Sequence, residues 1–320
     1  MTVAETVAGL RPLLFSIAYR MLGSVGGAED VTQEAFLRYE SALARGAVVE
    51  SPKAYLSAVV TRLAIDELRS ARARRETYAG QWLPEPLLTD EDAEDPYRLV
   101  ERADELSMAF LLVLERLGPV ERAVFLLHDV FGYGFGEIAE IVGRSPEACR
   151  QIAVRARRRV ADERPRFEAT RREREALADR FLAAVQDGDV DGLIGLLAAD
   201  VVVQGDGGGR APQWSRPIVG ADRVARLFAG LGRQIEEYDG RMERREVNGQ
   251  PGAIVRTADG QVVCAWSIEI AEGRVQAVRS VINPDKLRHL GPVADVWGLV
   301  RDRARRGRAG TADAGSDVSA

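Results

Sequence analysis

Apolar residues recur at intervals of three or four through most of the first half of the chain, the spacing of helices with one buried face. The pattern predicts helices over 10–22, 28–44 and 53–75, a further helix from about 96 to 117, and three shorter helices over 120–131, 135–142 and 146–159. Pro52 precedes the third helix at a position that favours a helix start. The folded parts of the first half are therefore expected to be helical.

After residue 175 the pattern changes. Helical spacing within 176–197 and 221–231 flanks the glycine-rich stretch VVVQGDGGGR at 201–210. Residues 261–270 then alternate between apolar and other residues, as a strand with one buried face does. Several helices followed by a meandering antiparallel sheet predict an α+β domain over 175–290.

Charge divides the chain further. The net charge is -5, yet residues 62–75 carry five arginines against two acids, and 76–105 carry ten acids against two arginines. Residues 150–159 hold five arginines and no acid. Such blocks are expected to face different partners. We interpret 77–105 as an acidic linker containing WLPEP, 162–174 as a charged connector, and 291–320 as a disordered tail.

Composition excludes several classes of protein. Two cysteines give no disulfide framework and fit a reducing compartment. His128 and His289 are the only histidines, which excludes a histidine-rich zinc site; no metal or cofactor is expected. The chain has no apolar run long enough to span a membrane and no signal peptide at its start, so a cytoplasmic location is expected.

Residues 135–159, FGEIAEIVGRSPEACRQIAVRARRR, have the pattern of a helix-turn-helix. Gly143 supplies the turn, Ser145 the N-cap and Pro146 the first helical position of the second helix. Side chains near the start of such a helix reach base edges in a major groove, and later arginines fit phosphates. The expected DNA-binding residues are Ser145, Glu147, Arg150, Gln151, Arg155, Arg157 and Arg158. A solvated helix pair is the alternative, which five arginines without an acid disfavour.

Two further stretches, AEDVTQEAFLRYE (28–40) and SPKAYLSAVVTRLAIDELRSARARRE (51–76), resemble region 2 of the extracytoplasmic-function (ECF) sigma factors of the sigma-70 family. Residues 117–160 resemble their region 4. The resemblance implies a non-enzymatic transcription initiation factor, monomeric when free, that binds core RNA polymerase at the β′ clamp and β flap. It would recognise the -35 and -10 promoter elements and melt DNA, with region 2 in residues 1–76 and region 4 in 106–161.

The resemblance also assigns residues in region 2. Asp30, Gln33 and Glu34 stand where such factors dock on the polymerase, on an exposed helix face expected to include Phe36 and Leu37; a merely solvated acidic face is the alternative. Side chains that would hold DNA at the -10 element, where an unstacked base needs a planar surface, are Tyr55, Arg62 and Arg69. Tyr55 could equally be a core aromatic, and Asp66 is expected to pair with a neighbouring arginine.

Residues 175–290 resemble a SnoaL-like domain of the NTF2-like cone fold. WLPEP at 82–86, DGGG before a basic residue at 206–210, and NPDKL at 283–287 are similar to the hallmarks of the SigJ-like subgroup, except that Arg210 stands where lysine is equally expected. The resemblance implies that this domain regulates the factor, and we expect it to set the spacing of the two DNA-reading modules. Residues expected to act in this regulation are Trp82, Pro84, Pro86, Asp206, Gly207, Gly208, Gly209, Arg210, Asn283, Pro284 and Asp285. Asp206 and Arg210 would hydrogen-bond across the domain contact.

Other interpretations stay open on the sequence. GDGGGR could be a plain tight turn, and the cone could bind a small apolar ligand. Related cone folds include enzymes, for which Asp206 or His289 would be the candidate general base. The chain could instead be a conventional helix-turn-helix regulator with a ligand-binding domain, which would bind operator DNA as a dimer. Cys149 could act as a thiol switch, although a packing role fits it better.

Overall fold

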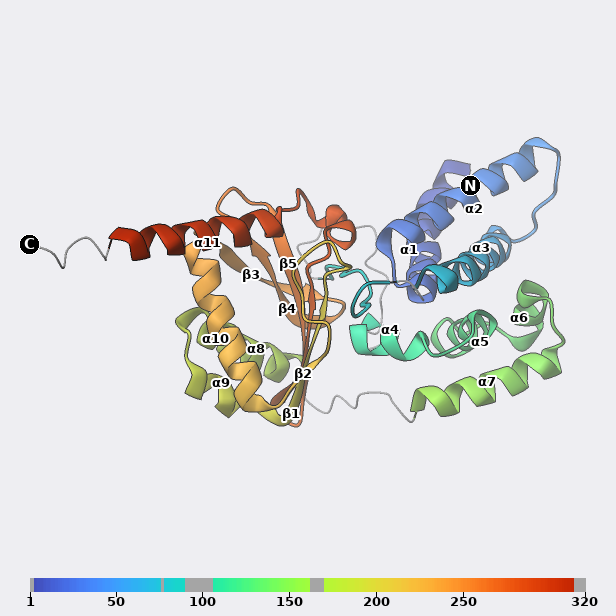
Figure 1. Ribbon diagram of the computed structural model, residues 1–320. Helices are drawn as coiled ribbons and strands as arrows, with labels where there is room; N and C mark the ends of the chain where they lie inside the picture. The colour runs from blue at the N-terminus through green and yellow to red at the C-terminus, as the bar shows by residue number, and fades with distance from the viewer. Residues whose placement is uncertain (1–2, 76–77, 90–105, 162–169, 314–320) are drawn as a thin grey trace, which may run out of the picture. The chain divides into compact units, whose positions relative to one another are not determined.

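The computed structural model describes residues 3–75, 78–89, 106–161 and 170–313 of the 320-residue chain. The chain divides into two compact units (Figure 1). Unit 1 comprises Met1–Tyr78, Trp82–Thr170 and Arg245–Pro251. Unit 2 comprises Ala79–Gln81, Arg171–Arg244 and Gly252–Ala320. Residues 79–81 thus belong to unit 2, although the residues on both sides of them belong to unit 1. Residues 245–251 belong to unit 1, although the residues on both sides of them belong to unit 2.

Unit 1 begins with three long helices: α1 (Val3–Leu22), α2 (Val25–Ala44) and α3 (Pro52–Arg75). Gly23, with a φ of 64°, separates the first two, and Ser24 caps α2 by accepting a hydrogen bond from the Gly27 N–H (3.0 Å). The cap explains why α2 starts three residues before the predicted position. The three helices of the sequence prediction are confirmed.

The second helical group of unit 1 contains α4 (Met108–Leu114), α5 (Pro119–Phe125), the π-helical turn η2 (Leu126–Val130), α6 (Phe135–Val142) and α7 (Pro146–Ala161). Its buried side chains form one continuous hydrophobic cluster with those of α1–α3. Leu14, Met21, Leu56, Phe110 and Leu126 are among the most deeply buried members. The two helical groups therefore share a single core.

Unit 2 contains helices α8 (Arg171–Asp187), α9 (Val190–Leu196) and α10 (Ala221–Glu237) and strands β1 (Leu197–Asp206), β2 (Ile218–Val219), β3 (Arg241–Val247), β4 (Gln250–Arg256), β5 (Val262–Ala271) and β6 (Arg274–Val281). The sheet order is β2-β1-β6-β5-β4-β3. β1 pairs with β6 in parallel, with Val203 opposite Val278, so the sheet is mixed. The predicted all-antiparallel sheet is wrong at this pair, because the meander β3–β6 returns β6 beside β1 in the same direction.

The helices of unit 2 pack on one face of its sheet (Figure 1). An aromatic cluster lies between them: the Phe228 ring is 5.1 Å from Phe181 and 5.2 Å from Trp266, both in edge-to-face geometry. All three side chains are at most 2% exposed. The interior of the cone is therefore filled by its own side chains at this level.

The C-terminal segment forms a helix where the sequence predicted a disordered tail. After η3 (Pro284–Lys286) and η4 (Arg288–Leu290), the chain forms helix α11 (Val296–Asp313). Val296 and Leu299 pack against the core of unit 2, which the Arg/Gly-rich composition concealed. The prediction of a disordered 291–320 tail is wrong for this helix; residues 314–320 lie outside the described residues.

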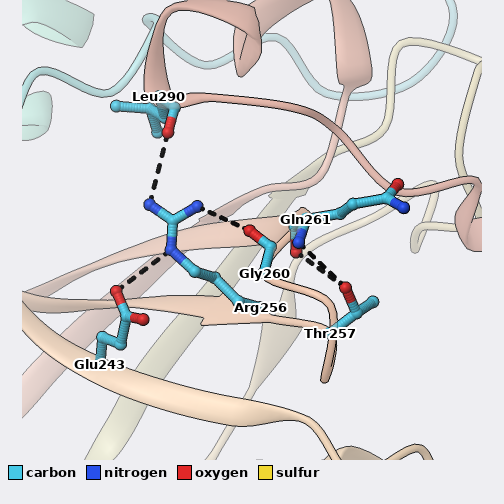
Figure 2. Close-up of polar contacts among 6 residues, drawn as sticks. All are labelled: Glu243, Arg256, Thr257, Gly260, Gln261 and Leu290. Carbon is cyan, nitrogen blue, oxygen red and sulfur yellow. Dashed lines mark hydrogen bonds and ion pairs between the residues drawn. The ribbon is translucent and has the colours of Figure 1, made fainter.

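The Arg256 side chain, at the end of β4, binds the segment that leads into α11 (Figure 2). Its guanidinium donates to the Gly260 and Leu290 carbonyls (3.1 and 3.3 Å) and forms an ion pair with Glu243 (3.1 Å). Two backbone hydrogen bonds then hold the segment before α11 against Val262 at the start of β5. One side chain thereby joins two strands, a turn and the C-terminal extension.

Candidate nucleic-acid interface

The helix-turn-helix forms as predicted. α6 ends at Gly143, whose φ of 66° is the left-handed conformation that favours glycine. Ser145 then accepts a hydrogen bond from the Ala148 N–H (3.2 Å) at the start of α7, so the cap is its role in the fold. The inner side of α7 consists of small or β-branched residues that let it lie close to α5 and α6: Cys149, Ala153, Ala156 and Val160.

The opposite side of α7 is exposed, and we call it the outward face: Glu147, Gln151, Val154, Arg155 and Arg158. Gln151 follows Glu147 by four residues, and Val154, Arg155 and Arg158 each lie three or four residues from another member, so the five share one side of the helix. The pKa of Glu147 lies below its usual value, chiefly because its own backbone N–H hydrogen-bonds the carboxylate. Charged and amide groups on one exposed helix face fit the donors and acceptors of a major groove.

Arg150 and Arg157 flank the outward face and already contact other parts of the fold. The Arg150 guanidinium lies 5.6 Å from the centroid of the Phe135 ring, and Arg157 Nε lies 2.6 Å from Asp129 Oδ1. Both side chains remain roughly half exposed, at 57% and 44%. Their positions suit phosphate contacts beside the groove better than base contacts within it.

The expected polymerase-docking residues share an exposed side of α2. Asp30 and Gln33 are exposed, and Glu34 is half-exposed and pairs with Arg38 (2.8 Å). Leu37 adds an apolar group that is 55% exposed. Phe36 points into the core at 7% exposure, so its expected place on this face is wrong.

The three residues expected at the -10 element have different surroundings. Tyr55 is half-buried against the core, 5.9 Å from the Tyr39 ring, as the core-aromatic alternative requires. Arg69 is exposed and pairs with Asp66 (3.1 Å), as expected for that aspartate. Arg62 donates to two backbone carbonyls at the end of α6, those of Glu140 (2.7 Å) and Ile141 (2.9 Å). Its guanidinium therefore caps the first helix of the helix-turn-helix.

Further polar contacts connect the two helical groups of unit 1. Tyr133 donates a hydrogen bond to Ser57 Oγ on α3 (2.7 Å), and burial raises the pKa of this tyrosine. The buried Arg122 guanidinium donates to the Met21 carbonyl (2.6 Å) and to Glu115 (2.8 Å). Hydrogen bonds to charged donors are stronger than neutral ones, so these contacts reinforce the shared core.

WLPEP docks on the junction between α1 and α2. The Glu85 carboxylate accepts hydrogen bonds from the backbone N–H groups of Val25 (2.6 Å) and Gly26 (3.2 Å), where the helix dipole favours an anion. Trp82 lies against Gly23; a Cβ there would come 3.0 Å from the indole. Pro84 and Pro86 are buried. Within unit 1, WLPEP therefore contacts the first helical group, α1–α3. The sequence did not predict this partner.

The tip of the β3–β4 hairpin, Arg245–Pro251, belongs to unit 1, whereas the rest of both strands belongs to unit 2. Its turn is Asn248-Gly249, with φ values of 55° and 66°. Asn248 is fully buried: its Nδ2 donates to Tyr19 Oη (2.6 Å) and to the Leu106 carbonyl (3.1 Å), and its Oδ1 accepts from the Leu87 N–H (3.0 Å). One side chain thus joins α1, the linker and the start of the second helical group.

The DGGGR and NPDKL motifs meet inside unit 2. Asp206 is fully buried and accepts a hydrogen bond from Lys286 Nζ (2.7 Å), and Arg210 pairs with Asp285 (3.1 Å). Asn283 caps η3, which begins at Pro284, by accepting from the Asp285 N–H (3.1 Å). In place of the expected hydrogen bonds across a domain contact, Asp206 and Arg210 each pair with the NPDKL motif of their own unit.

The glycines of DGGGR serve a tight turn and a close approach. A Cβ on Gly207 would lie 2.5 Å from the Ala211 carbonyl oxygen. Gly208 and Gly209 have φ values of 57° and 70°, and a Cβ on Gly209 would lie 3.0 Å from Ala79 of the linker. The turn alternative therefore holds, and the turn also packs against the linker segment of unit 2.

The two candidate general bases have different surroundings. Asp206 is bound to Lys286, and His289 is exposed in η4. Cys149 is buried, and burial raises the pKa of its thiol, which disfavours a thiolate switch. Among the described residues, no group of three or more metal-ligating side chains comes together, and no helix has the length and apolar character of a membrane span.

Comparison with known proteins gives three matching families. Residues 6–74 match sigma-70 region 2, residues 107–160 match sigma-70 region 4, and residues 178–302 match the SnoaL-like domain. The chain is 40% identical over 297 residues to the ECF RNA polymerase sigma factor SigJ of Mycobacterium tuberculosis, covering 89% of this chain and 93% of SigJ.

Two further relatives agree. A probable ECF RNA polymerase sigma factor, SigI of M. tuberculosis, is 32% identical over 285 residues, covering 87% of this chain and 92% of SigI. The crystal structure of M. tuberculosis SigJ superposes with a TM-score of 0.70 at 37% identity, covering 90% of this chain and 98% of that one. The similarity thus extends through the helical and the α+β parts alike.

Proposed function

Since the chain belongs to the ECF sigma factors of the sigma-70 family, with a fused SnoaL-like domain, we propose that its two DNA-reading groups rest in a closed arrangement that opens on the polymerase. The chain is a transcription initiation factor whose partners are core RNA polymerase and promoter DNA. We propose which residues bind the polymerase and the promoter elements, and which contacts hold the two helical groups together beforehand.

In the proposal, the outward face of α7 reads the -35 element and the α2 face of Asp30, Gln33 and Glu34 docks on the β′ clamp. The second helical group also binds the β flap. Arg62 and Arg69 hold DNA at the -10 element, with Tyr55 behind them in the core. These roles are supported by exposure on α2 and α7 and by the basic character of α3.

One observation carries the closed arrangement: the Arg62 guanidinium is hydrogen-bonded to the carbonyls of Glu140 and Ile141. The same group cannot hold the -10 strand while it caps α6. The two helical groups also share a core, so separating them exposes apolar surface, which is unfavourable without a new partner. Polymerase supplies such a partner.

We further propose that the SnoaL-like domain regulates through the hairpin tip rather than by catalysis. The tip contributes Asn248 to unit 1, and the strands that carry it continue into unit 2. The cone interior holds packed aromatic rings, and the buried Asp206 is neutralised by Lys286. A non-enzymatic regulatory role fits these features, and the proposed cytoplasmic location rests on the sigma-factor relatives.

The test is titration of the full chain against core polymerase. Reversal of two charges (Asp30→Lys with Glu34→Lys) is expected to abolish binding, because it places cations on the docking face. The control reverses Asp187 and Glu236, exposed acids near the ends of α8 and α10, with the same change in net charge. Equal loss of binding in both double variants would show that net charge, not the docking face, governs association.

Arg62→Ala in the same titration tests the closed arrangement. Loss of two hydrogen bonds from a charged donor corresponds to roughly a tenfold or larger shift toward the open form. We expect tighter binding to core polymerase together with weaker promoter melting. Unchanged core affinity with weaker melting would show that Arg62 serves DNA only and that the closed arrangement does not limit assembly.

A further inference from the structure

Val154 is the one apolar member of the outward face of α7. Its side chain is 46% exposed, and its neighbours along the face are Gln151, Arg155 and Arg158. Single exposed apolar residues are common on protein surfaces and by themselves indicate nothing. Val154 is unusual because it lies at the centre of a polar stripe, about two turns into the helix.

A folding role does not explain this position. The buried side of α7 is formed by Cys149, Ala153, Ala156 and Val160, whereas Val154 lies about 100° around the helix from Ala153. A polar side chain at this site would keep the same helix and the same core. The valine is therefore better explained by what the exposed face contacts than by what the fold needs.

The major groove offers one apolar group at the base edges, the C5-methyl of thymine. A valine between arginine and glutamine side chains matches a thymine between bases that present hydrogen-bond acceptors and donors. We propose that Val154 is a specificity-determining residue that recognises a thymine of the -35 element through its C5-methyl. The inference rests on the proposed reading of the -35 element by α7 and deepens it.

The experiment uses holoenzyme reconstituted from the full chain and core polymerase. A pool of promoter DNA with randomised -35 and -10 elements is bound by wild type and by Val154→Ala, and the retained DNA is sequenced. The matched control is Val300→Ala, another valine of comparable exposure (44%) that lies on α11. We expect one thymine position of the wild-type -35 preference to be lost in Val154→Ala and kept in the control.

A second measurement removes the methyl from the DNA instead of from the protein. Deoxyuridine replaces thymine at the preferred position, which deletes the C5-methyl and leaves base pairing intact. Loss of one buried methyl contact corresponds to about a fourfold weaker affinity for wild type. Val154→Ala is expected to bind the thymine and deoxyuridine forms equally, because the contact is already absent.

The outcomes separate two failures. If wild type selects a -35 sequence but Val154→Ala selects the same one, or if deoxyuridine costs both proteins equally, the thymine contact is wrong and the reading of the -35 element by α7 stands. If wild type shows no preference in the -35 element, the proposed function of α7 fails and the inference fails with it.

Discussion

The substitution Asn248→Gly tests most directly which contacts hold the hairpin tip in unit 1. Glycine accepts the φ of 55° at this position without strain, so the change removes side-chain contacts and keeps the turn. It removes the three hydrogen bonds that Asn248 makes, which deprives the Leu106 carbonyl and the Leu87 N–H of this partner, whereas Tyr19 Oη still donates to the Glu85 carbonyl (2.6 Å). The backbone bond from the Asn248 N–H to the Leu87 carbonyl (2.7 Å) remains.

The magnitude follows from the burial of these groups. A buried polar group that loses its partner costs about 1–3 kcal/mol, so the Leu106 carbonyl and the Leu87 N–H together give a loss of about 3 kcal/mol when some water enters the space. At 1.4 kcal/mol per tenfold change, the equilibrium for release of the tip shifts by about 100-fold or more. Burial holds the pKa of Tyr19 well above its usual value, so ionisation of the phenol offers no compensation at neutral pH.

Hydrogen exchange of the Thr89 and Gly249 amides measures release of the tip, because both are hydrogen-bonded between the tip and the linker. The Thr89 N–H donates to the Glu246 carbonyl (3.0 Å) and the Gly249 N–H to Thr89 Oγ1 (2.8 Å). We expect exchange at these two amides to accelerate by about 100-fold. The control is Gln276→Ala, which removes one side-chain bond to the Ala271 carbonyl (3.0 Å) in another hairpin and is expected to leave both amides unchanged. Unchanged exchange in Asn248→Gly, with the fold retained, would refute the role of the tip. Faster exchange without tighter core-polymerase binding would confirm the contact and reject its regulatory effect.

Three further predictions concern stability. Asp206→Asn is expected to destabilise the fold by about 3–5 kcal/mol in urea unfolding, because it removes the carboxylate charge that the buried Lys286 ammonium contacts; recovery in a variant that also carries Lys286→Met would confirm the cause, and a negligible loss would contradict the ion pair. Gly23→Ala should cost about 1–3 kcal/mol through its φ of 64° and its approach to Trp82, and a melting temperature equal to that of wild type would oppose this account. Burial raises the pKa of Cys264 from 9.0 to about 12, so the folded chain keeps this proton longer than the unfolded chain does and loses stability as the pH rises from 9 towards 12. The difference in free energy of unfolding between wild type and Cys264→Ala, measured from pH 8 to pH 11, checks this pKa: it should shift against wild type as the pH rises, and a constant difference would contradict it.

Much of unit 1 could be predicted from the sequence because the determining interactions are local. The apolar stripes of α1, α2 and α3 follow from spacing of three to four residues. The turn at Gly143 and the cap at Ser145 depend on neighbours within four residues, and the structure reproduces both. The pairing of Asp66 with Arg69 is likewise a contact within one helical turn.

One feature was present in the sequence as a local pattern and went unpredicted. Asn-Gly at 248–249 is the dipeptide that type I′ hairpins favour, and it could have located the β3–β4 turn. The partners of Asn248 could not have been found in that way. Tyr19 lies 229 residues away in the chain and Leu106 lies 142 away.

The sequence by itself therefore determined the helices, the helix-turn-helix and the residue types available for DNA and polymerase. Tertiary structure alone decided which of these groups are already engaged: Arg62 with Ile141, 79 residues on, and Asp206 with Lys286, 80 residues on. It also decided that α11 is a helix, since Leu299 finds an apolar core to pack against. Spacing specifies local hydrogen bonds and buried faces, whereas long-range pairs exist only once packing has excluded water and brought distant segments together.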